Sequence, residues 1–171
     1  SWYAEPGANI LVAAPSDGRD GIYTTDIEGN WGYSNGDYTD DFGGTSSATP
    51  LVSGVIALAL EANSNLTWRD IQHILVQSSR QNDASDSGWA TNGAGHEVSH
   101  KYGFGVIDAG AVVDIASTWN TVGAESVVDT GVLSVNGNIP DNTNNGLSDT
   151  ITISESLSVE TVEVIFDADH N

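Results

Sequence analysis

The 171-residue sequence contains no cysteine and no methionine, and only four Lys or Arg residues against 24 Asp or Glu residues. Without cysteine, neither a disulfide framework nor a thiolate metal site is available. The scarcity of basic residues leaves a formal net charge of -20 at pH 7. A surface of that sign repels nucleic acid and anionic lipid and attracts cations and basic peptides, so we expect no nucleic-acid partner. The same charge suits a surface adapted for solubility, so charge alone identifies no ligand.

Long hydrophobic runs are also absent. The most apolar stretch, residues 51–60, is shorter than the run of about 18 apolar residues that a membrane-spanning helix requires, so we expect no membrane span in this chain. An initiator methionine and a signal peptide are missing as well, and the opening Ser1-Trp2-Tyr3 is typical of the middle of a fold. The sequence therefore predicts a fragment of a longer protein, with enough apolar residues, 39%, for a core.

The first two thirds of the chain mix strand and helix signals. The apolar run at residues 10–14, closed by Pro15, predicts a buried strand, and residues 21–25 followed by a turn near Gly29 predict a hairpin. Residues 46–62 are rich in Ala and Leu on nearly every face, which predicts a helix buried in a core.

Two further helices are predicted downstream. Thr67 followed three residues later by Asp70 has the pattern of a capping box, and Ile71, Ile74 and Leu75 then form one apolar stripe. This pattern predicts an amphipathic surface helix that starts at Thr67. A shorter helix is predicted over residues 109–116.

Near Ala124 the composition changes from Ala-rich sequence to alternating Val, Thr and Ser. Residues 150–153 and 162–166 alternate as strands do, so we place a domain boundary between residues 1–123 and 124–171. A segment of about 45 residues is too short for a complete β-sandwich, whose usual size is about 100 residues. The second domain is therefore predicted to be truncated.

The segment with the clearest chemical signal is FGGTSSATP at residues 42–50, where two glycines precede hydroxyl residues at the start of the apolar helix. A serine at a helix N-terminus lies among unpaired N–H groups and at the positive end of the helix dipole. Negative charge that develops beside it is stabilised, and its own N–H can donate to an oxyanion. The alternative is that Ser46 only caps the helix, which is the usual role of such residues.

This segment, continued by LVSGVIALALEANSNLTWRDIQHILVQSS, resembles the nucleophile region of subtilisin-like serine proteases, and LTWRD resembles their kexin and furin branch. The segments SWYAE, WATNG, VSH and YGFG are similar to the same branch. The resemblance implies that Ser46 is the catalytic nucleophile and that its backbone N–H is one oxyanion donor.

The resemblance also implies a fold class and an activity. The fold class is α/β: residues 1–123 form the C-terminal portion of a parallel-sheet subtilase domain, and residues 124–171 form the first strands of an all-β sandwich, the P domain, on which the catalytic domain packs. The activity is a serine-type endopeptidase that acts on peptides or proteins through an acyl-enzyme and cleaves after basic residues. Members of this branch are secreted or lie at the cell surface.

A structural calcium ion is the implied cofactor, and Glu5 matches the branch's calcium-binding Glu in SWYAE. Calcium takes several oxygen ligands, and the other carboxylates are expected upstream of this chain. A second group of oxygen-bearing residues, Asp141, Asn142, Asn144 and Asp149, lacks the spacing of a known calcium loop, and we interpret it as a solvated turn.

The rest of the catalytic machinery is not evident. In this family the triad Asp and His precede the Ser, whereas the 45 residues before Ser46 include no histidine, and all four histidines, His73, His96, His100 and His170, follow it. No upstream residue matches the Asn that supplies the second oxyanion donor. We therefore expect one triad member here and no activity from the isolated chain. The alternative is a noncatalytic fragment or a surface interaction module that contains a P domain.

Overall fold

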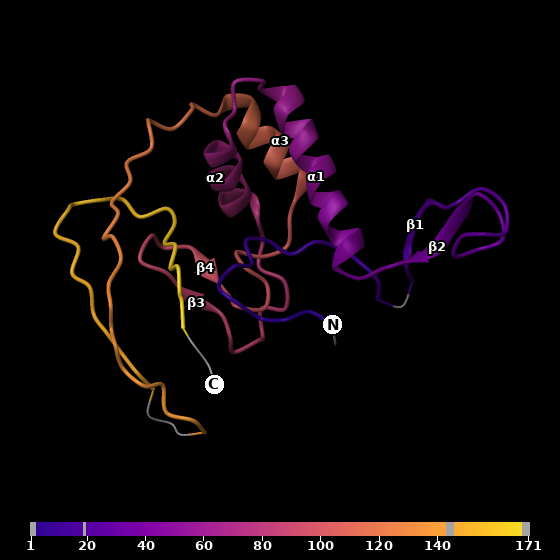
Figure 1. Cartoon of the computed structure of the whole chain (residues 1–171). Coiled ribbons are helices and arrows are strands. Elements are labelled where there is room, and N and C mark those ends of the chain that lie inside the picture. Colours follow the sequence, from indigo (N-terminus) through magenta and orange to yellow (C-terminus); the bar gives the residue numbers. More distant parts are fainter. Residues whose placement is uncertain (1–2, 19, 143–145, 169–171) are drawn as a thin grey trace. The chain divides into compact units, whose positions relative to one another are not determined.

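The computed structural model describes residues 3–18, 20–142 and 146–168, and divides the chain into unit 1, Ser1–Gly123, and unit 2, Ala124–Asn171 (Figure 1). The division falls at the residue where the composition changes. In the described part of unit 1 the helices are α1 (Thr45–Ala62), α2 (Trp68–Ser78) and α3 (Ala109–Thr118). The strands there are short: β1 (Ile22–Thr25), β2 (Tyr38–Phe42), β3 (Ala90–Thr91) and β4 (Glu97–Val98).

The predicted hairpin is confirmed. β1 pairs antiparallel with β2, with Thr25 opposite Tyr38 and an irregularity between Ile22 and Thr24. Gly29 adopts a positive φ of 79° in the connection, as its turn position requires. β2 ends two residues before the N-cap of α1, so the hairpin leads directly into the helix that carries Ser46 (Figure 1).

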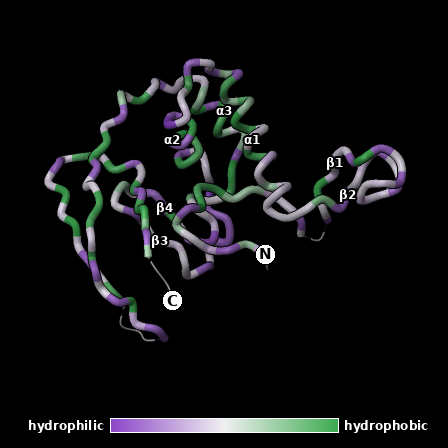
Figure 2. Tube along the Cα trace, in the orientation of Figure 1, coloured by the Kyte–Doolittle hydropathy of each residue, from purple (hydrophilic) through white to green (hydrophobic). Residues whose placement is uncertain are grey.

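The core of unit 1 lies among the three helices. α3 packs against both α1 and α2, and apolar segments on these helices appear green in Figure 2. The buried apolar side chains are Ala59, Leu66, Ile71, Ile74, Leu75, Val112 and Ala116. The stripe predicted on α2 thus faces inward, as expected of an amphipathic helix.

α2 begins with the predicted capping box. The Thr67 hydroxyl accepts the Asp70 N–H, and the Asp70 carboxylate accepts the Thr67 N–H at 2.7 Å. The same carboxylate is fully buried and also accepts the indole N–H of Trp119 and the N–H of Val122, each at 2.8 Å. Burial alone would raise the pKa of Asp70, but these hydrogen bonds outweigh burial and hold the pKa well below its ordinary value. Asp70 therefore fixes the segment after α3 onto the start of α2.

The prediction that α1 is a buried core helix is only partly met. Its residue range is confirmed to within one residue, but within unit 1 only Ser47 and Ala59 of this helix are buried, and Leu58 is 49% exposed. The reason is that in the described structure the principal neighbour of α1 is α3, which covers one face of it. The 18 residues of α1, Thr45–Ala62, are long and apolar enough to cross a membrane, judged by length and composition only. Core helices of globular proteins meet the same two criteria.

Residues 10–14 do not form the predicted extended strand. Val12 makes an antiparallel bridge with Gly103, and Ala13 makes a parallel bridge with Val106. The expected parallel sheet is therefore represented, in the part of the chain described, by this one parallel bridge. Parallel pairing needs neighbouring strands brought alongside by crossover connections, and in the described structure the long-range backbone hydrogen bonds of this segment go to Phe104, Gly105 and Ile107.

Unit 2 contains neither a helix nor a strand in its described residues, 124–142 and 146–168. The strands predicted over 150–153 and 162–166 are thus not confirmed. Alternation of apolar and polar residues is compatible with a strand. A strand forms only where a neighbouring strand pairs with its backbone N–H and C=O groups.

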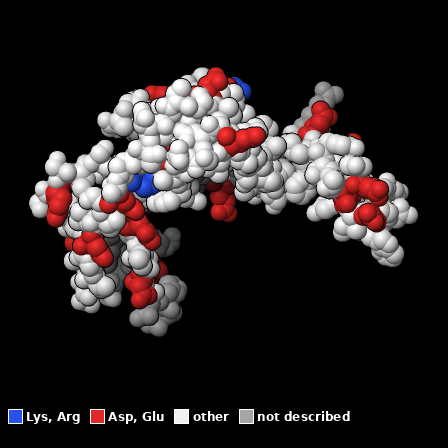
Figure 3. Space-filling view, turned by 90° about the horizontal axis from the view of Figure 1, so that it is seen from above, with Lys and Arg blue, Asp and Glu red and all other residues white. Residues whose placement is uncertain are grey.

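Among the charged side chains visible in Figure 3, acidic ones predominate and Lys and Arg are sparse. In the described part of unit 1, Lys101 contacts Asp86 at 2.5 Å and Arg80 contacts Asp108 at 3.8 Å. The Arg80–Asp108 pair is exposed at both side chains, so it contributes about 1 kcal/mol or less to stability, whereas the Asp86 side chain is mostly covered. The surface is consistent with the net charge computed from the sequence.

Candidate active site

The turn that enters α1 is built on two glycines. Gly44 is the N-cap residue and has φ 76° and ψ -175°, a combination that a residue with a side chain rarely adopts. Gly43 is constrained by space, because a Cβ there would lie 2.6 Å from the Cβ of Asp17. The chain can approach and turn into the helix at these two positions only without side chains.

Ser46 lies in the first turn of α1 and its side chain is exposed. Its hydroxyl makes no hydrogen bond to any residue among 3–18, 20–142 and 146–168, and the helix has no side-chain cap. The interpretation of Ser46 as a simple cap is therefore wrong, because Gly44 occupies the cap position. An exposed hydroxyl without an internal partner is free to meet a substrate.

The neighbouring Ser47 is placed differently. It is 1% exposed, and its hydroxyl donates to the Gly44 carbonyl at 2.9 Å. The backbone N–H groups of Ser47 and Ala48 also donate to that carbonyl, at 3.1 and 3.4 Å. The N–H groups of Thr45 and Ser46 have no acceptor among the described residues. Two unpaired donors and the positive end of the helix dipole thus lie beside the Ser46 hydroxyl.

A segment distant in the sequence holds this turn, and no sequence pattern predicts the contact. The Ser16 hydroxyl donates to the Gly44 carbonyl at 2.6 Å and lies 2.9 Å from the Ser47 hydroxyl. The Gly44 N–H donates to Asp17 Oδ1 at 3.3 Å, and the Tyr3 hydroxyl donates to the same oxygen. The hydrogen bond from Tyr3, followed by that from Gly44, lowers the pKa of the Asp17 carboxyl. Asp17 is therefore an anion at neutral pH.

The described histidines have other neighbours. His73 on α2 stacks on Trp119, with ring centroids 6.3 Å apart, and His96 meets the edge of Phe104 at 6.1 Å. His100 is exposed, and His170 lies outside the described residues. None of the three described histidines hydrogen bonds to Ser46, so the described residues supply no base to the Ser46 hydroxyl.

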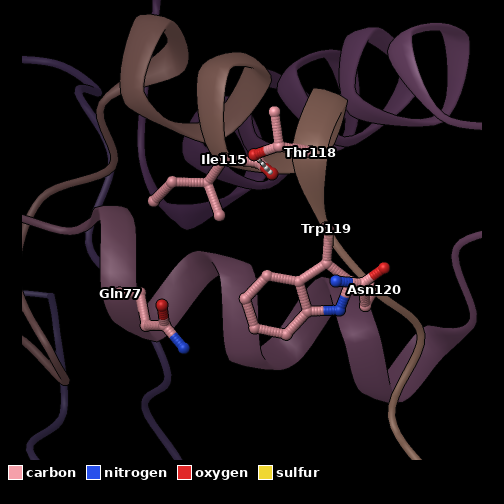
Figure 4. Close-up of a pocket in the computed structure, with 5 residues that line it drawn as sticks. All are labelled: Gln77, Ile115, Thr118, Trp119 and Asn120. Carbon is pink, nitrogen blue, oxygen red and sulfur yellow. Dashed lines mark hydrogen bonds between the residues drawn. The ribbon is translucent and has the colours of Figure 1, made fainter.

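A hollow on unit 1 lies away from the start of α1. It is lined by Gln77, Ile115, Thr118, Trp119 and Asn120, where the Thr118 hydroxyl donates to the Ile115 carbonyl (Figure 4). These residues come from α2, α3 and the segment after α3, and Ser46 is not among them. The hollow therefore does not extend the candidate site.

The metal prediction rests on Glu5, whose side chain is exposed. Across the described residues, no three His, Cys, Asp or Glu side chains gather closely enough to hold a metal ion. Calcium takes about six to eight oxygen ligands, of which the Glu5 carboxylate can supply at most two. Of the second group, Asp141, Asn142 and Asp149 are exposed, and Asn144 lies outside the described residues.

Comparison with known proteins places this site in a family. Residues 6–105 match the model of the subtilase family. The chain is 46% identical over 127 residues to Furin-1 of Xenopus laevis and 48% identical over 124 residues to proprotein convertase subtilisin/kexin type 6 of Homo sapiens. These matches cover 72% and 71% of this chain, and 15% and 12% of the relatives. The crystal structure of a serine protease of Aeromonas sobria superposes with a TM-score of 0.68 at 27% identity, over 71% of this chain and 28% of that one.

The chain belongs to the subtilase family, since the family model covers more than half of it and includes the glycine turn and Ser46. Within that family its relatives place it in the kexin and furin branch. The chain spans about 15% of the length of the furin proteins that it matches.

Proposed function

We propose that this chain is the nucleophile-bearing part of a serine endopeptidase and that Ser46 is the nucleophile. The observation that carries the proposal is the contrast between two adjacent hydroxyls inside the family match: Ser46 is exposed and unpartnered among the described residues, whereas Ser47 is buried and bonded. That contrast supports Ser46, rather than Ser47, as the reactive serine of the GTSS motif.

The chemistry assigned to Ser46 is acyl transfer. Its Oγ attacks the carbonyl carbon of the scissile peptide bond while a base takes the hydroxyl proton. The negative charge that develops on the carbonyl oxygen is met by the Ser46 N–H and the positive end of α1. The C–N bond then breaks, the amine leaves with the proton, and water hydrolyses the acyl-enzyme. The base and a second oxyanion donor belong to parts of the protease other than the residues described, so the isolated chain is expected to be inactive.

The substrate class in this proposal is peptides or proteins with basic residues before the scissile bond. Its support is the net charge of -20, which attracts basic peptides, together with membership of the kexin and furin branch. A structural calcium ion is proposed as well, with Glu5 as one of several oxygen ligands and the others outside the described residues. Calcium would supply folded-state stability by binding only the native protein.

Residues 124–171 are proposed as the beginning of a P domain that packs on the catalytic domain, and the enzyme as secreted or at the cell surface. The support is the alternating sequence after Ala124 and the branch to which residues 6–105 belong. No strand supports the P-domain assignment within the described residues of unit 2.

The test is hydrolysis of internally quenched peptides by the full-length protein that contains this chain. Peptides with Lys-Arg before the cleavage point should be cut, and matched peptides with Glu-Glu should not. Ser46→Ala should lower kcat by at least about 1,000-fold with unchanged folding. Ser53→Ala is the matched control, because Ser53 also carries an exposed hydroxyl on α1, bonded only to the Thr49 carbonyl. Undiminished hydrolysis by Ser46→Ala would refute the assignment.

A further inference from the structure

The geometry points to Ser16 and Asp17 as positioning residues that aim Ser46 at its substrate by holding the Gly44 peptide from both sides. The inference rests on the proposed role of Ser46 as the nucleophile. Neither residue touches Ser46, and each acts through the backbone of the turn before α1.

The hold on Gly44 is two-sided. The Ser16 hydroxyl donates to the carbonyl of Gly44 at 2.6 Å, and the Asp17 carboxylate accepts the N–H of Gly44 at 3.3 Å. Two adjacent residues thus bind the donor and the acceptor of one glycine that lies 27 and 28 positions further along the chain. Such a pair of contacts fixes the orientation of the glycine as well as its location.

The turn before α1 depends on contacts from Ser16 and Asp17 because few contacts within the turn itself restrain it. α1 begins at Gly44 without any side-chain cap, and glycine has more backbone freedom than any other residue. A change in φ or ψ at Gly44 would swing the next two residues, Thr45 and Ser46, together with their unpaired N–H groups. The Ser46 hydroxyl and its oxyanion donor would then move as one unit.

A count of hydroxyl protons shows that the contacts are compatible. Tyr3 donates its proton to Asp17, and Ser16 donates its own to the Gly44 carbonyl, the shortest contact that it makes. The Ser47 proton then goes either to the Gly44 carbonyl or to Ser16 Oγ, each 2.9 Å away. Each hydroxyl therefore donates once, and the two acceptors, carboxylate and carbonyl, are satisfied.

Support of the turn can be separated from support of the fold. Asp17 is exposed and lies outside the apolar core formed by the three helices, so its removal should disturb packing little. A residue that only stabilised the protein would change its melting temperature and the amount of active enzyme. A residue that positions the nucleophile changes the rate of the chemical step at each intact site.

The experiment measures kcat, KM and the rate of acylation by a fluorophosphonate in the full-length protein, with concentrations corrected for folded enzyme. Ser16→Ala and Asp17→Ala should each lower kcat and the acylation rate by between about 10-fold and 100-fold, because a misplacement near 1 Å costs that much. KM should stay within about twofold, since substrate contacts outside the turn are unchanged.

Asp17→Asn is the conservative partner, because its amide oxygen can still accept the Gly44 N–H, and it should restore most of the rate lost in Asp17→Ala. Ser53→Ala, on the same helix but outside the turn, should match wild type. If Ser16→Ala does not fold, the two Asp17 variants decide the matter. Wild-type kcat in Asp17→Ala, or an equal loss in Asp17→Asn and Asp17→Ala, would overturn the positioning role.

Ser46→Ala, measured in parallel, separates this inference from the one on which it rests. If Ser46→Ala keeps its activity, the nucleophile assignment fails and the positioning role fails with it. If Ser46→Ala is inactive while Ser16→Ala and Asp17→Ala have wild-type kcat, the nucleophile assignment stands and only the positioning role is refuted.

Discussion

Replacing Asp70 tests the account of how unit 1 is held together. Its buried carboxylate accepts the Thr67 N–H and hydroxyl at 2.7 and 2.6 Å, and the Trp119 indole and Val122 N–H at 2.8 Å. Asp70→Ala leaves three N–H donors without this acceptor, at about 1–3 kcal/mol each if none finds a substitute. With partial relaxation and entry of water we expect a total loss of about 4 kcal/mol in the free energy of unfolding.

The assay is urea unfolding of the full-length protein, as a double-mutant cycle with Trp119→Phe, which removes the indole donor and keeps an aromatic ring. The coupling free energy between the two positions should be about 1.5–3 kcal/mol, the range for a hydrogen bond to a charged group. A loss below about 1 kcal/mol in Asp70→Ala, or no coupling, would refute the reasoning.

The same contacts give a pH dependence with a definite sign. The folded-state pKa of Asp70 lies below its unfolded value, so its stabilising contribution is complete above about pH 4 and is lost as the pH falls through the folded pKa. Asp70→Asn resembles the protonated residue. The free energy of unfolding of Asp70→Asn should therefore lie below that of wild type by a constant amount between pH 5 and 7, where Asp70 is ionised in the wild type. This difference should shrink below about pH 4. A deficit that grows on acidification would contradict this sign.

Two further variants test the turn and the calcium proposal, both in the full-length protein. Gly44→Ala should cost about 1–3 kcal/mol in stability and also lower kcat, whereas Gly29→Ala, at a similar positive φ in the hairpin, should cost stability alone; equal kcat in the two variants would contradict the role of the turn. Glu5→Gln should raise the calcium concentration required for activity and lower the melting temperature at limiting calcium, with partial recovery at saturation. Calcium titrations that superimpose on wild type would remove Glu5 from the metal site.

Local signals in the sequence predicted local structure well. The Thr67 and Asp70 capping box needs only residues three apart, and it starts α2 as predicted. The glycine turn before Ser46 is likewise local, and it put an exposed hydroxyl at the start of α1. Residue type alone does not distinguish Ser46 from Ser47, because both are hydroxyl residues in the first helical turn; the family resemblance assigns the reactive role to Ser46, which is exposed, whereas Ser47 is buried.

Long-range features could not be predicted in the same way. Nothing in Pro15-Ser16-Asp17 indicates that these residues bond a glycine 27 or 28 positions away, since such a contact depends on the tertiary fold. The apolar composition of α1 predicts more burial than the structure shows, because composition does not determine which neighbouring elements cover a helix. The strands after Ala124 were predicted from alternation alone, and alternation does not supply a hydrogen-bonding partner.

The central claim, that Ser46 is the nucleophile, is tested most directly by mapping the adduct of a fluorophosphonate on the folded full-length protein by peptide mass spectrometry. We predict one adduct, on Ser46, that is absent after denaturation before labelling and absent in Ser46→Ala. An adduct on Ser47, or labelling that persists in Ser46→Ala, would contradict the assignment.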